Sequence, residues 1–88
     1  MIATKPMSAI ELKTIIFQLL GQIAPEADFA ALDPDQPIQS ELDIDSFDFL
    51  NFLIGLNEEV GVEIPEADYG QVATLNALVS YVMAHSGR

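Results

Sequence analysis

The sequence predicts a small all-α protein, a helical bundle of three main helices and one short helix around a single core. Three apolar stripes with helical spacing support this prediction, and no segment shows the alternation of a half-buried strand. The chain has 88 residues, and half of them are hydrophobic, which suits one packed core. We therefore expect one domain over residues 1–88, with residues 1–7 as a loose N-terminus.

The first predicted helix begins at Ser8 and ends before Pro25. Ser8 and Glu11 have the spacing of a capping box, in which each side chain accepts the other residue's backbone N–H. Apolar residues then recur at intervals of three and four, which predicts one buried stripe. These residues are Leu12, Ile15, Ile16, Leu19, Leu20 and Ile23.

A long loop is predicted between the first and second helices, from Pro25 to Asp43. Prolines and acidic residues are frequent in this segment, and its apolar residues show no sustained periodicity. Loops of this length are uncommon in small domains and are often functional. Because the segment contains Phe29, Leu32 and Ile38, we expect parts of it to fold back onto the core.

Asp45 or Ser46 is predicted to cap the second helix, which runs to about Val60 and ends at Gly61. At about 100° per residue, its side chains fall on three faces. The core face comprises Phe49, Phe52, Leu53, Leu56 and Val60. The solvated face comprises Asp48, Asn51, Gly55, Glu58 and Glu59.

The third face of this helix is also apolar and consists of Phe47, Leu50 and Ile54. One buried stripe does not explain it. Phe47 and Ile54 border the acidic residues, so we expect them to be partly exposed and to form a docking patch. The preceding loop could equally cover Leu50.

The remaining residues predict an extended link, one turn of helix and a last helix. The link spans residues 62–65 and the turn residues 66–70, and Thr74 is a plausible cap for the last helix. The last helix has its own apolar stripe, formed by Leu75, Leu78, Val79 and Val82. His85 follows, at the end where a cation complements the helix dipole.

The charge of the chain is strongly one-sided. The chain has fourteen acidic and three basic residues, which gives a net charge of −11. No Lys or Arg occurs from Thr14 to Gly87. This balance argues against nucleic acid as a partner, because phosphates require positive charge. We expect instead that the chain docks onto basic patches of other proteins, with an affinity that salt weakens.

Nothing in the sequence predicts a membrane span or a secretory signal. No apolar run approaches the ~18 residues that cross a bilayer, and Glu11 and Lys13 interrupt the apolar stretch near the N-terminus. With no cysteine, the chain has neither a disulfide nor a thiolate metal site. We expect a cytoplasmic monomer.

Ser46 is the candidate functional residue. If Asp45 caps the second helix, Ser46 takes its first position and projects outward, where a phosphodiester would meet free backbone N–H groups and the positive helix end. The sequence offers no base to activate this hydroxyl, because His85 ends the last helix and Lys5 and Lys13 lie in the N-terminal segment. We therefore predict that another enzyme modifies Ser46.

Three neighbouring segments together resemble the acyl carrier protein family. They are residues 45–48 (Asp-Ser-Phe-Asp), residues 56–61 (Leu-Asn-Glu-Glu-Val-Gly) and residues 62–65 (Val-Glu-Ile-Pro). The family pattern is Asp-Ser-Leu, an acidic helix and a Glu-Ile-Pro link. The resemblance implies that Ser46 carries 4′-phosphopantetheine, transferred from coenzyme A by a phosphopantetheinyl transferase. The thiol of this arm would hold acyl groups as thioesters, in fatty acid, polyketide or specialised lipid biosynthesis.

The resemblance also implies roles for residues around the serine. Asp45 and Asp48 would help the transferase and its magnesium ion to engage the site. Phe47 stands where the family usually has leucine and would contact acyl-loading, elongating or acyl-transfer enzymes. The full set of expected docking residues is Asp45, Phe47, Asp48, Leu50, Asn51, Ile54, Glu58 and Glu59.

The chain departs from the usual family pattern in its second helix. Asn51 and Asn57 stand where housekeeping members often have glutamate, and the helix is unusually aromatic. Fewer charges should weaken docking to generic basic patches. We therefore expect a specialised carrier that serves a dedicated pathway.

Other functions fit the residues less well. An aminoacyl or peptidyl carrier shares the serine and the bundle but is often less acidic. An acidic helical adaptor without a cofactor would use the same apolar patch to bind a partner helix. A calcium loop from Asp43 lacks the required glycine and final glutamate, so we expect no metal site. An Asp-x-Asp phosphatase needs a parallel sheet, which this sequence does not predict.

Overall fold

The computed structural model describes residues 8–85, and every regular element in this range is a helix. The three long ones are α1 (Ala9–Ile23), α3 (Ser46–Val60) and α4 (Leu75–His85). The short ones are η1 (Phe29–Ala31), α2 (Ile38–Leu42) and η2 (Glu66–Val72). The predicted all-α bundle is therefore confirmed. The prediction of a loose N-terminus at 1–7 falls outside the described residues.

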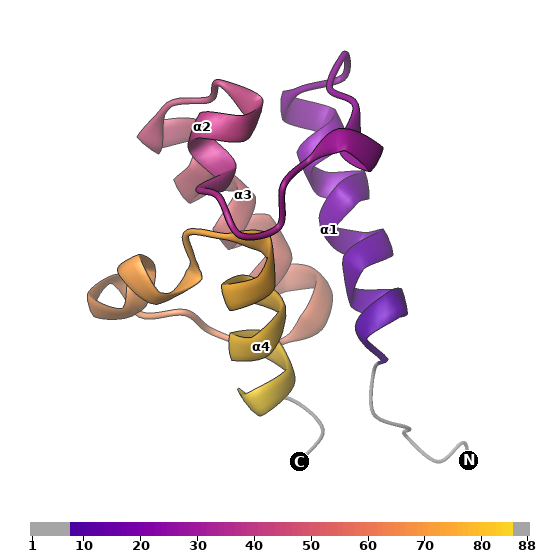
Figure 1. Cartoon of the computed structure of the whole chain (residues 1–88). Helices are drawn as coiled ribbons and strands as arrows, with labels where there is room; N and C mark the ends of the chain where they lie inside the picture. The colour runs from indigo at the N-terminus through magenta and orange to yellow at the C-terminus, as the bar shows by residue number, and fades with distance from the viewer. Residues whose placement is uncertain (1–7, 86–88) are drawn as a thin grey trace.

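The bundle is built on α1, which packs against both α3 and α4, while η2 packs against α4. Figure 1 shows that the first turn of α1 and the last turn of α4 lie at the same end of the bundle, and that α2 lies at the opposite end. The core contains side chains from all three long helices and from the segments between them. The connection from α1 to α3 therefore closes one end of the molecule.

The start of α1 has the predicted capping box. Ser8 Oγ accepts the Glu11 N–H at 3.1 Å, and Glu11 Oε1 accepts the Ser8 N–H at 3.0 Å. The predicted stripe is also confirmed, since Leu12, Ile16 and Leu20 are completely buried. Ile15, Leu19 and Ile23 are half-buried and pack against this core.

The segment predicted as one long loop contains two short helices, so that part of the prediction is wrong in detail. Within residues 25–43, η1 forms one turn and α2 spans five residues. Periodicity does not reveal a helix this short, because only Ile38 of α2 is fully buried. The expected return to the core is confirmed, because Leu32 and Ile38 are buried and Phe29 packs against the core.

Three hydrogen bonds fix this segment to the start of α4. The Ile38 N–H donates to the Ala73 carbonyl at 2.8 Å. The Asn76 backbone N–H donates to the Pro34 carbonyl at 3.0 Å, and Asn76 Nδ2 donates to Asp35 Oδ1 at 2.7 Å. These contacts join residues about forty positions apart in the chain and fix the place of α2.

The second half of the chain follows the predicted order of elements. Gly61 ends α3 with φ +74°, a left-handed conformation that suits glycine. η2 is a 3₁₀-helix over residues 66–72, longer than the single turn predicted for residues 66–70. Thr74 Oγ1 accepts the Ala77 N–H at 3.0 Å, as a helix cap does. In α4 the predicted stripe is confirmed: Leu75, Leu78 and Val82 are buried and Val79 is half-buried.

Tyr81 links η2 to α4. Its hydroxyl donates to Asp68 Oδ2 at 2.7 Å, and Gln71 Nε2 donates to the other oxygen of the same carboxylate at 3.2 Å. The His85 ring stacks on Tyr81 at a centroid distance of 4.1 Å, and its Nδ1 bonds the Tyr81 carbonyl at 2.8 Å. The hydrogen bond to Asp68, with burial and the nearby charge, raises the pKa of Tyr81 above its ordinary value of 10.0.

This link predicts how stability depends on pH. A tyrosine whose pKa is raised by folding stabilises the native state fully below its unfolded pKa of about 10, and the stabilisation is lost as the pH rises through the folded pKa. We expect Tyr81→Phe to lower the midpoint of thermal unfolding at neutral pH and the difference from wild type to shrink in alkaline solution. Tyr69→Phe is the control, and a Tyr81→Phe difference that stays constant in alkaline solution would contradict the assignment.

Candidate functional site

Ser46 is the first residue of α3, and its side chain is exposed. Asp45 is the N-cap, with extended backbone (φ −88°, ψ 177°), and its Oδ1 accepts the Asp48 N–H at 2.8 Å. This settles which of the two predicted residues caps the helix. The Ser46 hydroxyl is therefore not used as a cap and faces solvent at the corner between α2 and α3.

Gln39, on α2, contacts this serine, and the sequence analysis missed it. Its Nε2 donates to Ser46 Oγ at 3.3 Å. The backbone carbonyl of Gln39 accepts two N–H groups. One is from Asp43, the C-cap of α2, and the other is from Ile44 at 3.1 Å. Asp43 has φ +55°, in the left-handed region, and this turns the chain from α2 toward α3. Both ends of Gln39 thus hold the turn that leads to Ser46.

The surroundings of Ser46 suit a bound phosphate ester. The first backbone N–H groups of α3 have no partner inside the helix, and the positive end of its dipole lies at the same place. The carboxylates of Asp45 and Asp48 flank the serine. The backbone therefore attracts an anion at Ser46, whereas the two carboxylates repel it.

Among the described residues, no His or Lys side chain reaches this hydroxyl. His85 bonds and stacks on Tyr81 in the last turn of α4, and Lys13 lies on α1. Within residues 8–85, no group of three or more His, Cys, Asp and Glu side chains gathers as a metal site would require. The serine can be modified by an enzyme that brings its own base.

The apolar side of α3 next to Ser46 is open to solvent, as predicted for two of its members. Phe47 is 69 % exposed and Ile54 is 49 % exposed. Leu50 is half-buried between them. Asn51, Glu58 and Glu59 are exposed, whereas Asp48 is half-buried and lines a cleft on the other side of the helix. The predicted docking residues are thus exposed, except for Leu50 and Asp48, which are half-buried.

A small cavity lies beside this surface. Its volume is about 270 Å³, and its lining includes Leu53, Ile54 and Glu58 of α3 together with Ile64 and Tyr69. Two of these residues, Ile54 and Glu58, belong to the predicted docking set. A partner that covers this face of α3 therefore also covers the mouth of the cavity.

Among the described residues, no helix has the length and apolar character that crossing a membrane requires.

Comparison with known proteins places these features in a family. The family model described as "Phosphopantetheine attachment site" matches residues 10–82. The chain is 32 % identical to the acyl carrier protein of Lactobacillus acidophilus over 62 residues, which cover 70 % of this chain and 78 % of the relative. It is 30 % identical to the acyl carrier protein of Solidesulfovibrio magneticus over 79 residues, which cover 90 % and 95 %. The acyl carrier protein of Lactobacillus johnsonii is 35 % identical over 51 residues, which cover 58 % and 64 %.

The matched region runs from α1 into α4 and includes Ser46 and its neighbours. Proteins of this kind are carriers and do not catalyse reactions themselves. The cofactor-free adaptor is thereby set aside. The chain belongs to the acyl carrier protein family and holds covalently attached 4′-phosphopantetheine.

Proposed function

We propose that Ser46 is the residue to which 4′-phosphopantetheine is attached. The observation that carries this proposal is the position of Ser46, exposed at the first residue of α3 with the capping role taken by Asp45. A phosphodiester there gains from the N–H groups of the first turn and from the helix dipole. The matched relatives and the attachment-site model support the proposal, because the matched residues span this helix.

A phosphopantetheinyl transferase is the proposed modifying enzyme. The Ser46 oxygen forms a bond to the phosphorus that carries pantetheine in coenzyme A, and the bond from that phosphorus to the adenosine bisphosphate group breaks. We assign the acceptor of the hydroxyl proton to the transferase, because Gln39 donates to Ser46 and His85 is bonded to Tyr81. Asp45 and Asp48 would engage the transferase and its magnesium ion.

The arm would then present acyl groups as thioesters to partner enzymes in the cytoplasm. The chain has no cysteine, so the thiol comes from the cofactor. We propose that basic patches of acyl-loading, elongating or acyl-transfer enzymes dock on the exposed face of α3. Phe47 and Ile54 supply apolar contact there, and Glu58 and Glu59 supply charge. The pathway would be fatty acid, polyketide or specialised lipid biosynthesis.

The attachment site is tested by mass. Incubation of the full chain with coenzyme A and a promiscuous transferase is expected to add one phosphopantetheine, and Ser46→Ala is expected to abolish the gain. Ser40→Ala is a matched control, since Ser40 is also exposed and lies on α2. Intact-protein mass spectrometry measures the result. A gain that persists in Ser46→Ala moves the site to another residue.

The contact from Gln39 predicts a slower transfer when it is removed. Loss of one hydrogen bond of about 0.5–1.5 kcal/mol corresponds to a fall in the transferase kcat/KM of roughly two- to tenfold for Gln39→Ala. Gln39→Glu keeps the size but loses the donor, so we expect a similar fall. The control is Gln71→Ala, which removes the bond to Asp68 on η2. An unchanged kcat/KM for both Gln39 variants would contradict the role, provided that thermal unfolding shows each variant folded.

Asn51 and Asn57 support a specialised role, because they remove charge from the docking helix. We expect housekeeping fatty acid synthesis enzymes to load and elongate on this carrier more slowly than on their own. Asn51→Glu should raise that turnover, whereas Gln71→Glu, with the same change of charge on η2, should not. Initial rates of acyl loading measure both. Turnover by wild type equal to that of the enzymes' own carrier would rule the specialised role out.

A further inference from the structure

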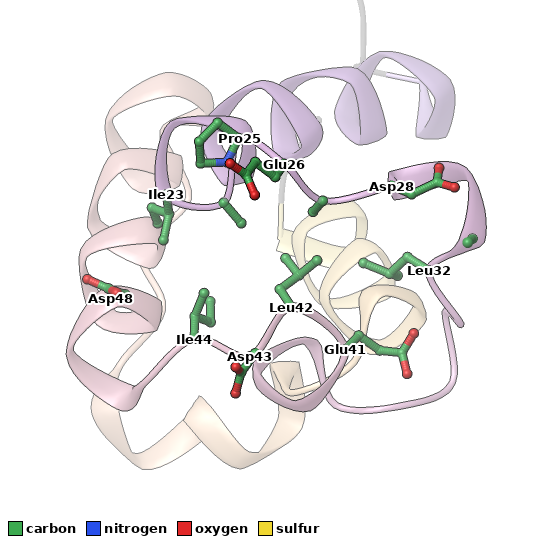
Figure 2. Close-up of a pocket in the computed structure, with 13 residues that line it drawn as sticks. Ile23, Pro25, Glu26, Asp28, Leu32, Glu41, Leu42, Asp43, Ile44 and Asp48 are labelled. Atoms are coloured by element: carbon green, nitrogen blue, oxygen red, sulfur yellow. The ribbon is translucent and has the colours of Figure 1, made fainter.

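A cleft of about 700 Å³ opens at the end of the bundle, where α1, α2 and the start of α3 meet (Figure 2). Of its lining residues, only Asp48 belongs to the docking set predicted around Ser46. Ligand pockets in proteins have volumes of roughly 300–1,000 Å³, so the cleft is large enough for several side chains of a partner. The function proposed above leaves this cleft unused.

The floor of the cleft is apolar. Figure 2 shows Ile23, Leu42 and Ile44 around the opening, and all three are half-buried. Leu32 also lines the cleft and is buried. Half-buried aliphatic side chains keep surface that a ligand can still remove from water, at about 25 cal/mol per Å² of apolar area. The floor therefore favours an aliphatic group.

The rim of the cleft is acidic, and no Lys, Arg or His lines it. Figure 2 shows Glu26, Asp43 and Asp48 on different sides of the opening. Among the described residues, these three carboxylates accept no hydrogen bond and form no ion pair. Asp28 and Glu41 also line the cleft, but each already accepts a backbone N–H, from Ala30 and Asp33 respectively. Three rim charges are thus free to pair with a cation.

The end of α1 adds to this negative potential. α1 ends at Ile23, which lines the cleft, and its last turn carries no basic residue. The carboxyl end of a helix is equivalent to roughly half a negative charge. The start of α3, near Asp48, adds positive potential on the other side of the cleft. The acidic side chains of the rim are therefore what favour a cation here.

We propose that this cleft docks a cationic amphipathic segment of a partner protein, in which aliphatic side chains reach the floor while arginine or lysine side chains pair with the rim. A second copy of this chain does not fit, because each copy has a net charge of −11 and Lys13 is the only Lys or Arg among the described residues. The proposal does not depend on phosphopantetheine and adds a second surface to the one on α3.

The probe for this proposal is a short, acetylated and amidated peptide that alternates leucine and arginine. It is titrated into the full, unmodified chain at low ionic strength, where surface charges are least screened. Proton–nitrogen correlation spectra of the isotope-labelled chain measure binding. We expect saturable shifts in residues 23–32 and 41–44. Shifts confined to residues 47–59 of α3, or shifts that do not saturate, would overturn the proposal.

Matched variants separate the cleft from general acidity. Glu26→Gln with Asp43→Asn removes two rim charges, and asparagine tolerates the left-handed backbone at this position. We expect the peptide dissociation constant to rise by roughly fivefold, as for two exposed charge pairs. Glu63→Gln with Glu66→Gln removes two exposed charges elsewhere and should change it by less than roughly twofold. Equal effects of the two double variants would contradict the assignment.

Two further peptides test the two halves of the chemistry. One replaces leucine by serine, and the other replaces arginine by glutamine. Both are expected to bind more weakly than the parent peptide, and equal binding by either would overturn the amphipathic proposal. Glu26 lies in an exposed turn. The single variant Glu26→Gln therefore allows the peptide affinity to be measured if the double variant is unstable.

Discussion

Ile38 is completely buried, and its backbone N–H donates to the carbonyl of Ala73 at the start of α4. The position of α2 depends on this contact, since α2 is too short to be stable by its own hydrogen bonds. Through α2 the same contact determines where Gln39 lies and where the chain turns at Asp43. The place of Ser46 is thus fixed by the buried side chain of Ile38, eight positions before it, and by a helix far along the chain.

The acidic residues of the chain are more than a source of net charge. Asp45 caps α3, Asp28 caps η1, and Asp35 ties the connection to α4. Asp68 accepts hydrogen bonds from Tyr81 and Gln71. Glu41 accepts the Asp33 N–H. Each of these carboxylates is partly neutralised by a donor of the chain itself. Among the described residues, the carboxylates without such a donor lie on α3, around the cleft, and at Glu63 and Glu66 before and within η2.

Much of the architecture could be predicted from the sequence. Apolar residues at helical spacing predict the long helices. The caps at Ser8, Asp45 and Thr74 can be predicted from neighbouring residues alone. The exposure of Phe47 and Ile54 could be predicted from their positions around the helix, because each lies beside acidic residues.

The rest depended on contacts between distant or irregular segments. α2 has one fully buried residue and therefore no period to detect. Gln39 contacts Ser46 across a turn in which Asp43 has a left-handed conformation, and no sequence pattern predicts that turn. Asp48 was expected to be solvated, but the folded connection covers it and makes it part of the cleft wall.

Asp43 belongs at once to the turn that orients Ser46 and to the wall of the cleft. A residue other than glycine with φ +55° occupies a sparsely populated backbone state, which costs on the order of 1 kcal/mol. A substitution of Asp43 therefore alters the turn before Ser46 and the wall of the cleft together.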